Sequence, residues 1–108
     1  MAEQPNGGVR YHVSLSEVFI RTMKRLQRQA ARQGRGDQLL AAFQIIGEQL
    51  QYDPLRLGEP LFRLPALRVQ VRSVAVRPLH ITFGVCEDRP IVFISAAKLL
   101  AARSADDS

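Results

Sequence analysis

The chain has a single cysteine, only two lysines and no apolar run long enough to span a membrane. One cysteine, Cys86, excludes an intramolecular disulfide framework, and no second cysteine or nearby histidine accompanies it to form a zinc site. We therefore expect Cys86 to fill space at the end of a strand, and we expect neither a metal nor an organic cofactor. Because no charged segment followed by an apolar one opens the chain, we expect a cytoplasmic protein with no membrane partner.

Length and composition indicate one globular domain. The 108 residues suffice for one modest core and are too few for two. They are 46% hydrophobic and 23% charged, as in folded proteins rather than disordered ones. The terminal segments MAEQPNGG (1–8) and SADDS (104–108) have little to bury, so we predict disordered tails around a domain from 9 to 103.

The positive charge of the chain comes mainly from arginine. The net charge is +5 and the isoelectric point is near 10.3, although all but two of the fifteen basic residues are arginine. The planar guanidinium pairs bidentately with phosphate and carboxylate groups. This balance favours a nucleic acid or an acidic protein as partner.

A first amphipathic helix is predicted to begin beside Ser14. The segment from Ser14 to Glu17 has the capping-box pattern, in which a serine accepts from a free amide and the glutamate reaches back to the cap. An apolar stripe at helical spacing consists of Phe19, Met23, Leu26 and Ala30. A basic stripe about half a turn away consists of Arg21, Arg25, Arg28 and Arg32. The basic side is either a solvated face or a surface for phosphate or an acidic partner.

A second amphipathic helix is predicted after a short link. The Gly-Arg-Gly segment at 34–36 stops the first helix, and Asp37 is expected to cap the second. The apolar stripe of this helix consists of Leu39, Phe43, Ile46 and Leu50. Pro54 ends the helix near Tyr52, because the residue before a proline is disfavoured in helical conformation. The short link predicts an antiparallel helical hairpin.

The stretch from 67 to 85 is predicted to form two antiparallel strands with one apolar and one polar face. The polar face consists of Arg68, Gln70, Arg72, His80 and Thr82. The apolar phase slips near Ser73, which predicts a bulge or the hairpin turn at that point. Upstream, residues 55–65 are predicted to form a loop that includes an extended piece at 61–64.

Three further elements complete the prediction. Residues 9–13 are expected to form a short strand, 91–94 a buried strand and 96–103 a closing helix. The order strand, two helices, three strands and helix predicts an α+β domain, β-α-α-β-β-β(-α). In it the helical hairpin packs on one face of a small antiparallel sheet.

This order of elements, together with DPLRLGEPLFRLPALRVQVRS (53–73) and PLHITFGV (78–85), resembles the RelE/ParE superfamily of bacterial toxin-antitoxin toxins. The family has a helical hairpin, a loop with an Asp-Pro pair and a glycine, a basic strand, and a strand with an aromatic residue near its end. The resemblance covers almost the whole predicted domain. It implies a type II toxin whose partner is a cognate acidic antitoxin.

The resemblance also implies roles for single residues. The family's basic strand of lysine, apolar, lysine, apolar, arginine and serine falls on residues 68–73, and an arginine of the next strand falls on His80. In RelE-type toxins these groups stabilise the phosphate of messenger RNA in the ribosomal A site while the ribose 2'-hydroxyl attacks it. The chain departs from the pattern at Gln70 and His80, and no tyrosine follows Phe93. Histidine remains suited to proton transfer near neutral pH.

Two classes of function remain open. The first is a ribosome-dependent mRNA endoribonuclease with His80, Arg72 and Arg68 as catalytic residues. Its RNA-binding residues would be Arg63, Arg77, Gln70, Arg21, Arg25, Arg28 and Arg32. The second is a binding protein, either a ParE-like inhibitor of DNA gyrase or a decayed toxin that holds an antitoxin. The basic, histidine-containing sheet face favours the first class, and the missing RelE groups favour the second.

Overall fold

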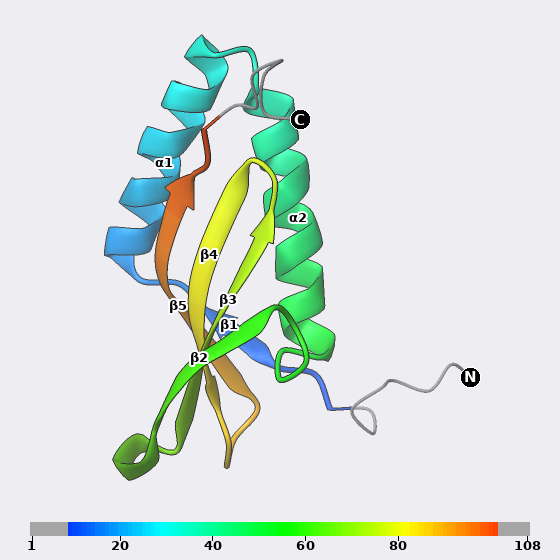
Figure 1. The fold of residues 1–108 in the computed structure, drawn as a ribbon, viewed down its shortest axis with the longest axis vertical. Helices are drawn as coiled ribbons and strands as arrows, with labels where there is room; N and C mark the ends of the chain where they lie inside the picture. The colour runs from blue at the N-terminus through cyan, green and yellow to red at the C-terminus, as the bar shows by residue number, and fades with distance from the viewer. Residues whose placement is uncertain (1–8, 102–108) are drawn as a thin grey trace, which may run out of the picture.

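The computed structural model describes residues 9–101, which form two helices packed on a five-stranded mixed sheet (Figure 1). In chain order the elements are β1 (His12–Ser14), α1 (Glu17–Arg32), α2 (Gly36–Tyr52), β2 (Glu59–Leu64), a 3₁₀ turn (Pro65–Leu67), β3 (Val69–Val76), β4 (Leu79–Cys86) and β5 (Ile91–Leu99). The strands lie in the order β1-β5-β4-β3-β2. The β1-β5 pair is parallel and the other pairs are antiparallel. The α+β class is confirmed, and the predicted tails lie outside the described residues. The predicted antiparallel sheet is wrong, because β1 pairs in parallel with β5 and four strands rather than three follow the helical hairpin.

The core lies between the helical hairpin and one face of the sheet. The predicted stripe of α1 is fully buried, and α2 buries Leu39, Ile46 and Leu50, while Phe43 packs at the margin of the core. From the sheet, β4 contributes alternate residues that are inaccessible to solvent: Leu79, Ile81, Phe83 and Val85. We call this side of the sheet the helix face and the other side the open face.

Both helices begin at positions that differ from the predicted ones. The cap of α1 is Ser16, not Ser14, and its Oγ accepts a hydrogen bond from the Phe19 amide at 3.0 Å. The helix therefore starts two residues later than a capping box at Ser14 requires. In α2 the helix already includes Gly36, so Asp37 lies in the first turn and does not cap it. Its carboxylate there still complements the positive end of the helix dipole.

The predicted bulge or turn near Ser73 is wrong. Strand β3 pairs with β4 without interruption over its full length, and the hairpin turn lies beyond it, at residues 77–78. The apolar phase changes because the two ends of β3 are covered on opposite faces. Val74 packs under the helices, whereas Val69 and Val71 belong to a second, smaller cluster on the open face.

The predicted helix over 96–103 is also wrong where the structure describes it. Strand β5 continues to Leu99 and pairs Lys98 with His80, after a bulge that leaves Ser95 without a partner in β4. Alanine favours helices, but such preferences are weak compared with tertiary contacts. Here β4 offers backbone partners along its whole length, and Leu99 packs against the core.

Candidate functional site at the polar end of the open sheet face

The predicted polar face is divided between the two sides of the sheet. Residues directly opposite each other in antiparallel strands share a face, and Arg72 is opposite Phe83, which is buried on the helix face. His80 is opposite Ala75 and alternates with the core residues of β4, so it lies on the open face. Arg68 precedes β3 and adopts a left-handed conformation with φ of 51°. The three predicted catalytic residues are therefore not assembled into one site.

Arg72 is engaged inside the protein. Its side chain is buried, its Nε donates to the Leu57 carbonyl at 2.9 Å, and one terminal nitrogen donates to the Gly58 carbonyl at 3.3 Å. The other terminal nitrogen donates to the side-chain oxygen of Gln70. Two of the predicted site residues thus bind each other, and the guanidinium clamps the loop that leads into β2.

Gly58 is the second element of this clamp. It has φ of +67°, and a Cβ at this position would lie 1.9 Å from the Ser73 carbonyl oxygen, so a residue with a side chain would displace the loop. The close approach of Gly58 to β3 fixes the start of β2 at Glu59. The register then places Glu59 opposite Ser73, on the open face.

A hollow of about 390 Å³ opens where these segments meet. It is lined by Gly58, Glu59, Ser73, Val74, Ala75 and His80. A carboxylate and an imidazole therefore share one concave site, and Lys98 of β5 lies directly across from His80 in the sheet. We call this region, with Thr82 beside it, the polar end of the open face. A carboxylate and an imidazole in one hollow, with a cation beside the imidazole, are groups suited to acid-base chemistry on a phosphodiester.

Glu59 was not predicted from the sequence. The extended piece was expected to begin at Leu61, which left Glu59 in a loop, whereas the strand begins at Glu59 itself. A register shift between Pro60 and Phe62 changes which side chains of β2 face each way, and no periodicity could indicate it.

The other half of the open face is apolar. Its residues are Phe62, Leu64, Val69, Val71, Cys86, Ile91 and Phe93. The Phe93 ring covers Gly84, because a Cβ on that glycine would lie 2.6 Å from the ring. Phe62 is 56% exposed. We call this region the apolar end of the open face.

The remaining predicted RNA-binding residues lie away from the hollow. Arg63 donates to the Glu87 carboxylate at 2.7 and 2.6 Å. This hydrogen-bonded pair raises the pKa of Arg63 and lowers the pKa of Glu87. Arg77 lies in the β3-β4 turn and donates to the Ala101 carbonyl at 3.3 Å. The predicted arginines of α1 are exposed on the outer side of that helix.

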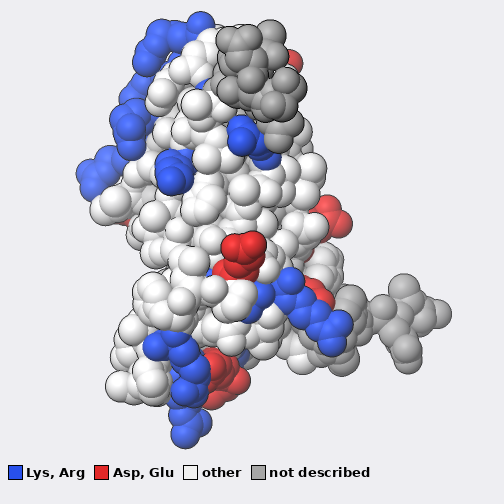
Figure 2. Space-filling model, in the orientation of Figure 1, with Lys and Arg blue, Asp and Glu red and all other residues white. Residues whose placement is uncertain are grey.

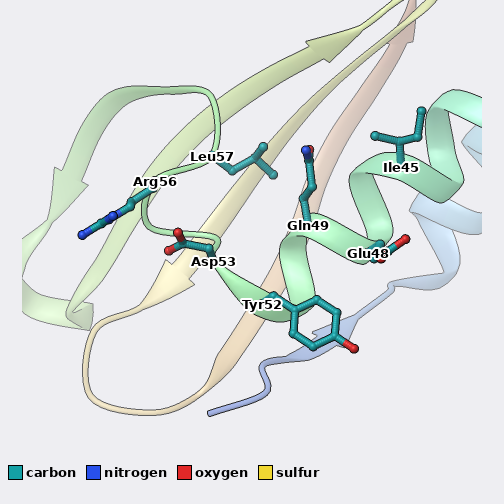
Figure 3. A pocket seen from close by; sticks show the side chains of 7 residues that line it. All are labelled: Ile45, Glu48, Gln49, Tyr52, Asp53, Arg56 and Leu57. Carbon is teal, nitrogen blue, oxygen red and sulfur yellow. The ribbon is translucent and has the colours of Figure 1, made fainter. Parts of the chain in front are cut away.

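A larger hollow of about 460 Å³ lies at the end of α2 (Figure 3). It is lined by Ile45, Glu48, Gln49, Tyr52, Asp53, Arg56 and Leu57. In Figure 3 the tips of Arg56 and Tyr52 point in opposite directions, and Tyr52 is already held by Arg10, which lies 5.1 Å from its ring centre. The polar groups that line this hollow do not converge on one point. We therefore place the candidate site at the polar end of the open face.

Comparisons of this chain with protein-family models, curated proteins and solved structures find no match. Among residues 9–101, no group of three or more histidine, cysteine, aspartate or glutamate side chains is placed to hold a metal ion. None of the helices in that range has the length and apolar character needed to cross a membrane.

Proposed function

We propose that the protein is a toxin of the RelE/ParE type that cleaves messenger RNA on the ribosome, with its reaction at the polar end of the open face. The observation that carries this proposal is that Glu59 and His80 line one hollow. The order of one strand, a helical hairpin and then a run of antiparallel strands supports the family assignment.

The reaction follows from the groups at the hollow. The Glu59 carboxylate takes the proton of the ribose 2'-hydroxyl, whose oxygen then forms a bond to phosphorus. The bond from phosphorus to the 5'-oxygen breaks, and the His80 imidazolium gives that oxygen a proton. Lys98 lies beside His80 in the sheet and supplies positive charge near the phosphate. The products are a 2',3'-cyclic phosphate and a free 5'-hydroxyl.

A second function is favoured by the position of Arg72. Because its guanidinium is buried and bound to loop carbonyls, it does not reach a phosphate on the open face. In this second function the protein acts by binding alone, either as a gyrase inhibitor or as a partner for an antitoxin. Both candidate functions include a small acidic antitoxin, and the exposed Phe62 and Phe93 offer an apolar seat for an amphipathic segment of it.

Expression of the chain alone, with mapping of the 5' ends of cellular RNA, separates the two functions. Growth arrest with codon-positioned cuts that disappear in His80→Ala and Glu59→Gln supports the ribonuclease. The matched controls are His12→Ala and Glu48→Gln, which change the same residue types outside the hollow and should leave cleavage intact. Arrest with intact RNA and damaged DNA would refute cleavage in favour of gyrase. If the neighbouring reading frame encodes no acidic partner, both toxin assignments are weakened.

A further inference from the structure

Helix α1 carries five cations on its exposed side. They are Arg21, Lys24, Arg25, Arg28 and Arg32, and we call them the basic stripe. Figure 2 shows blue side chains gathered along the outer edge of the molecule, over the position of α1 in Figure 1. The one acidic residue of the helix is Glu17, at its first position. Within residues 9–101, none of the five forms an ion pair with an acidic side chain.

The direction of the basic stripe is fixed by the core. The opposite side of α1 is buried against the sheet and α2 through its apolar stripe, so the helix cannot rotate without exposing that stripe. At a rise of about 1.5 Å per residue, the stripe from Arg21 to Arg32 extends over roughly 16 Å. The helix therefore fixes the five side chains in one row on the same side of the molecule.

No acidic side chain in the described part of the chain forms an ion pair with this row. Like charges three or four residues apart repel each other on a helix surface, and Arg28 has such neighbours at positions 24, 25 and 32. Helix propensity does not require arginine here, because glutamine supports a helix almost as well. An anion from outside the chain would remove the repulsion.

The composition of the stripe distinguishes between possible anions. Exposed large hydrophobic residues of α1 are confined to its first turn, at Val18 and Ile20, and none lies between 21 and 32. Protein interfaces, in contrast, have an apolar centre inside a polar rim. Contacts with a phosphate backbone need only cations and hydrogen-bond donors. A nucleic-acid backbone is a regular series of negative charges, which a row of cations can bind without any apolar contact.

We infer that the basic stripe docks on the phosphate backbone of double-helical RNA. The choice of RNA rests on the proposed function. The stripe lies on the helix side of the sheet and the hollow lies on the open side, so the stripe does not hold the strand that is cut. It binds a folded part of the same RNA assembly and brings the hollow to its substrate.

The test measures binding of the full chain to a labelled RNA hairpin of about 16 base pairs over a range of salt concentrations. The triple variant Arg21→Gln, Arg25→Gln and Arg28→Gln should reduce the slope of log affinity against log salt by about 2 to 3. The control triple variant, Arg10→Gln, Arg56→Gln and Arg89→Gln, removes the same charge from exposed positions elsewhere and should leave the slope almost unchanged. Circular dichroism checks that both variants are folded.

Three results would overturn the inference. One is an equal loss of binding in the two triple variants, because net charge would then account for it. Another is that a DNA duplex of the same sequence binds more tightly than the RNA hairpin. The third is that polyglutamate binds as tightly as the RNA hairpin. The inference and the proposed function fail separately. If the protein binds the hairpin through the stripe but does not cleave RNA, only the proposed ribonuclease function is refuted. If the stripe variant cleaves RNA as well as the unchanged protein does, only the inference about the stripe is refuted.

Discussion

Replacing Arg72 with methionine should destabilise the fold strongly, because Arg72 ties the loop before β2 to the centre of the sheet. Its side chain is 7% exposed and donates to the carbonyls of Leu57 and Gly58, at 2.9 and 3.3 Å. Methionine retains much of the length and apolar stem of arginine, but it has no donor. The substitution therefore removes the clamp and leaves most of the packing.

The magnitude follows from those two hydrogen bonds. A bond that involves a charged group contributes about 1.5 to 3 kcal/mol when it is well formed. The bond to Leu57 has good length, whereas the bond to Gly58 is long and its carbonyl belongs to an exposed residue, which water can solvate. The expected loss is therefore about 2 to 4 kcal/mol, which corresponds to a fall in Tm of roughly 10 to 25 °C for a domain of this size.

Chemical denaturation followed by circular dichroism measures this loss, and Arg77→Met is the matched control. Arg77 is exposed in the β3-β4 turn and makes one long bond, so its replacement should change stability by less than about 0.5 kcal/mol. If Arg72→Met changes stability as little as Arg77→Met does, Arg72 does not hold the loop in place. Loss of RNA cleavage in such a folded Arg72→Met variant would show instead that Arg72 acts on the substrate.

Gly58→Ala gives an independent measurement on the same loop. The added Cβ would lie 1.9 Å from the Ser73 carbonyl oxygen, and the backbone has φ of +67°, so we expect a loss of at least about 2 kcal/mol. Because both substitutions release the same loop from β3, the double variant with Arg72→Met should lose less than the sum of the two single losses. Strict additivity would mean that Arg72 and Gly58 act on separate parts of the structure.

Three further predictions concern other parts of the fold. Ser16→Ala should lower stability by about 1 kcal/mol through loss of the helix cap, whereas Ser14→Ala should leave the thermal transition of the protein unchanged. Because the hydrogen bond from Arg63 lowers the pKa of Glu87, this pair stabilises the fold above the ordinary pKa of a glutamate and loses that contribution as the pH falls through the lowered value. Glu87→Gln should therefore lower Tm near neutral pH but leave it unchanged in strong acid, as a pH series of thermal scans would show. Gly84→Ala places a Cβ 2.6 Å from the ring of Phe93, so the ring must move. Urea denaturation should therefore show that the free energy of unfolding falls by about 1 to 3 kcal/mol.

The helices were predictable because each has one apolar stripe against one core. The spacing of Phe19 to Ala30 and of Leu39 to Leu50 follows the helical period, and both stripes are buried, with Phe43 at the margin. The starting residues were less predictable, because serine occurs at both 14 and 16 and either can cap a helix. Only the path of the chain from β1 selects Ser16.

The strands were less predictable because a period of two shows that side chains alternate but not which face is covered. Along β3 the cover changes from the open face at Val69 to the helix face at Val74, and the sequence pattern alone resembles a bulge. Segment 96–99 has the composition of a helix and becomes a strand through pairing with β4. Glu59 was missed for a related reason, since its role depends on the partner strand that fixes its register.

The pairing of β3 with β4 decides which residues can act together. For Arg72 and His80 to share a face, β4 would have to slip by one residue, and such a slip would turn its core side chains toward solvent. Each of those side chains is inaccessible to solvent, as in Ile81 and Phe83, and exposing one costs about 1.5 to 3 kcal/mol. Four such losses reach roughly 6 to 12 kcal/mol, which equals the whole stability of an ordinary domain. Any chemistry at His80 must therefore use residues of the open face, such as Lys98 beside it in the sheet and Glu59 in the same hollow.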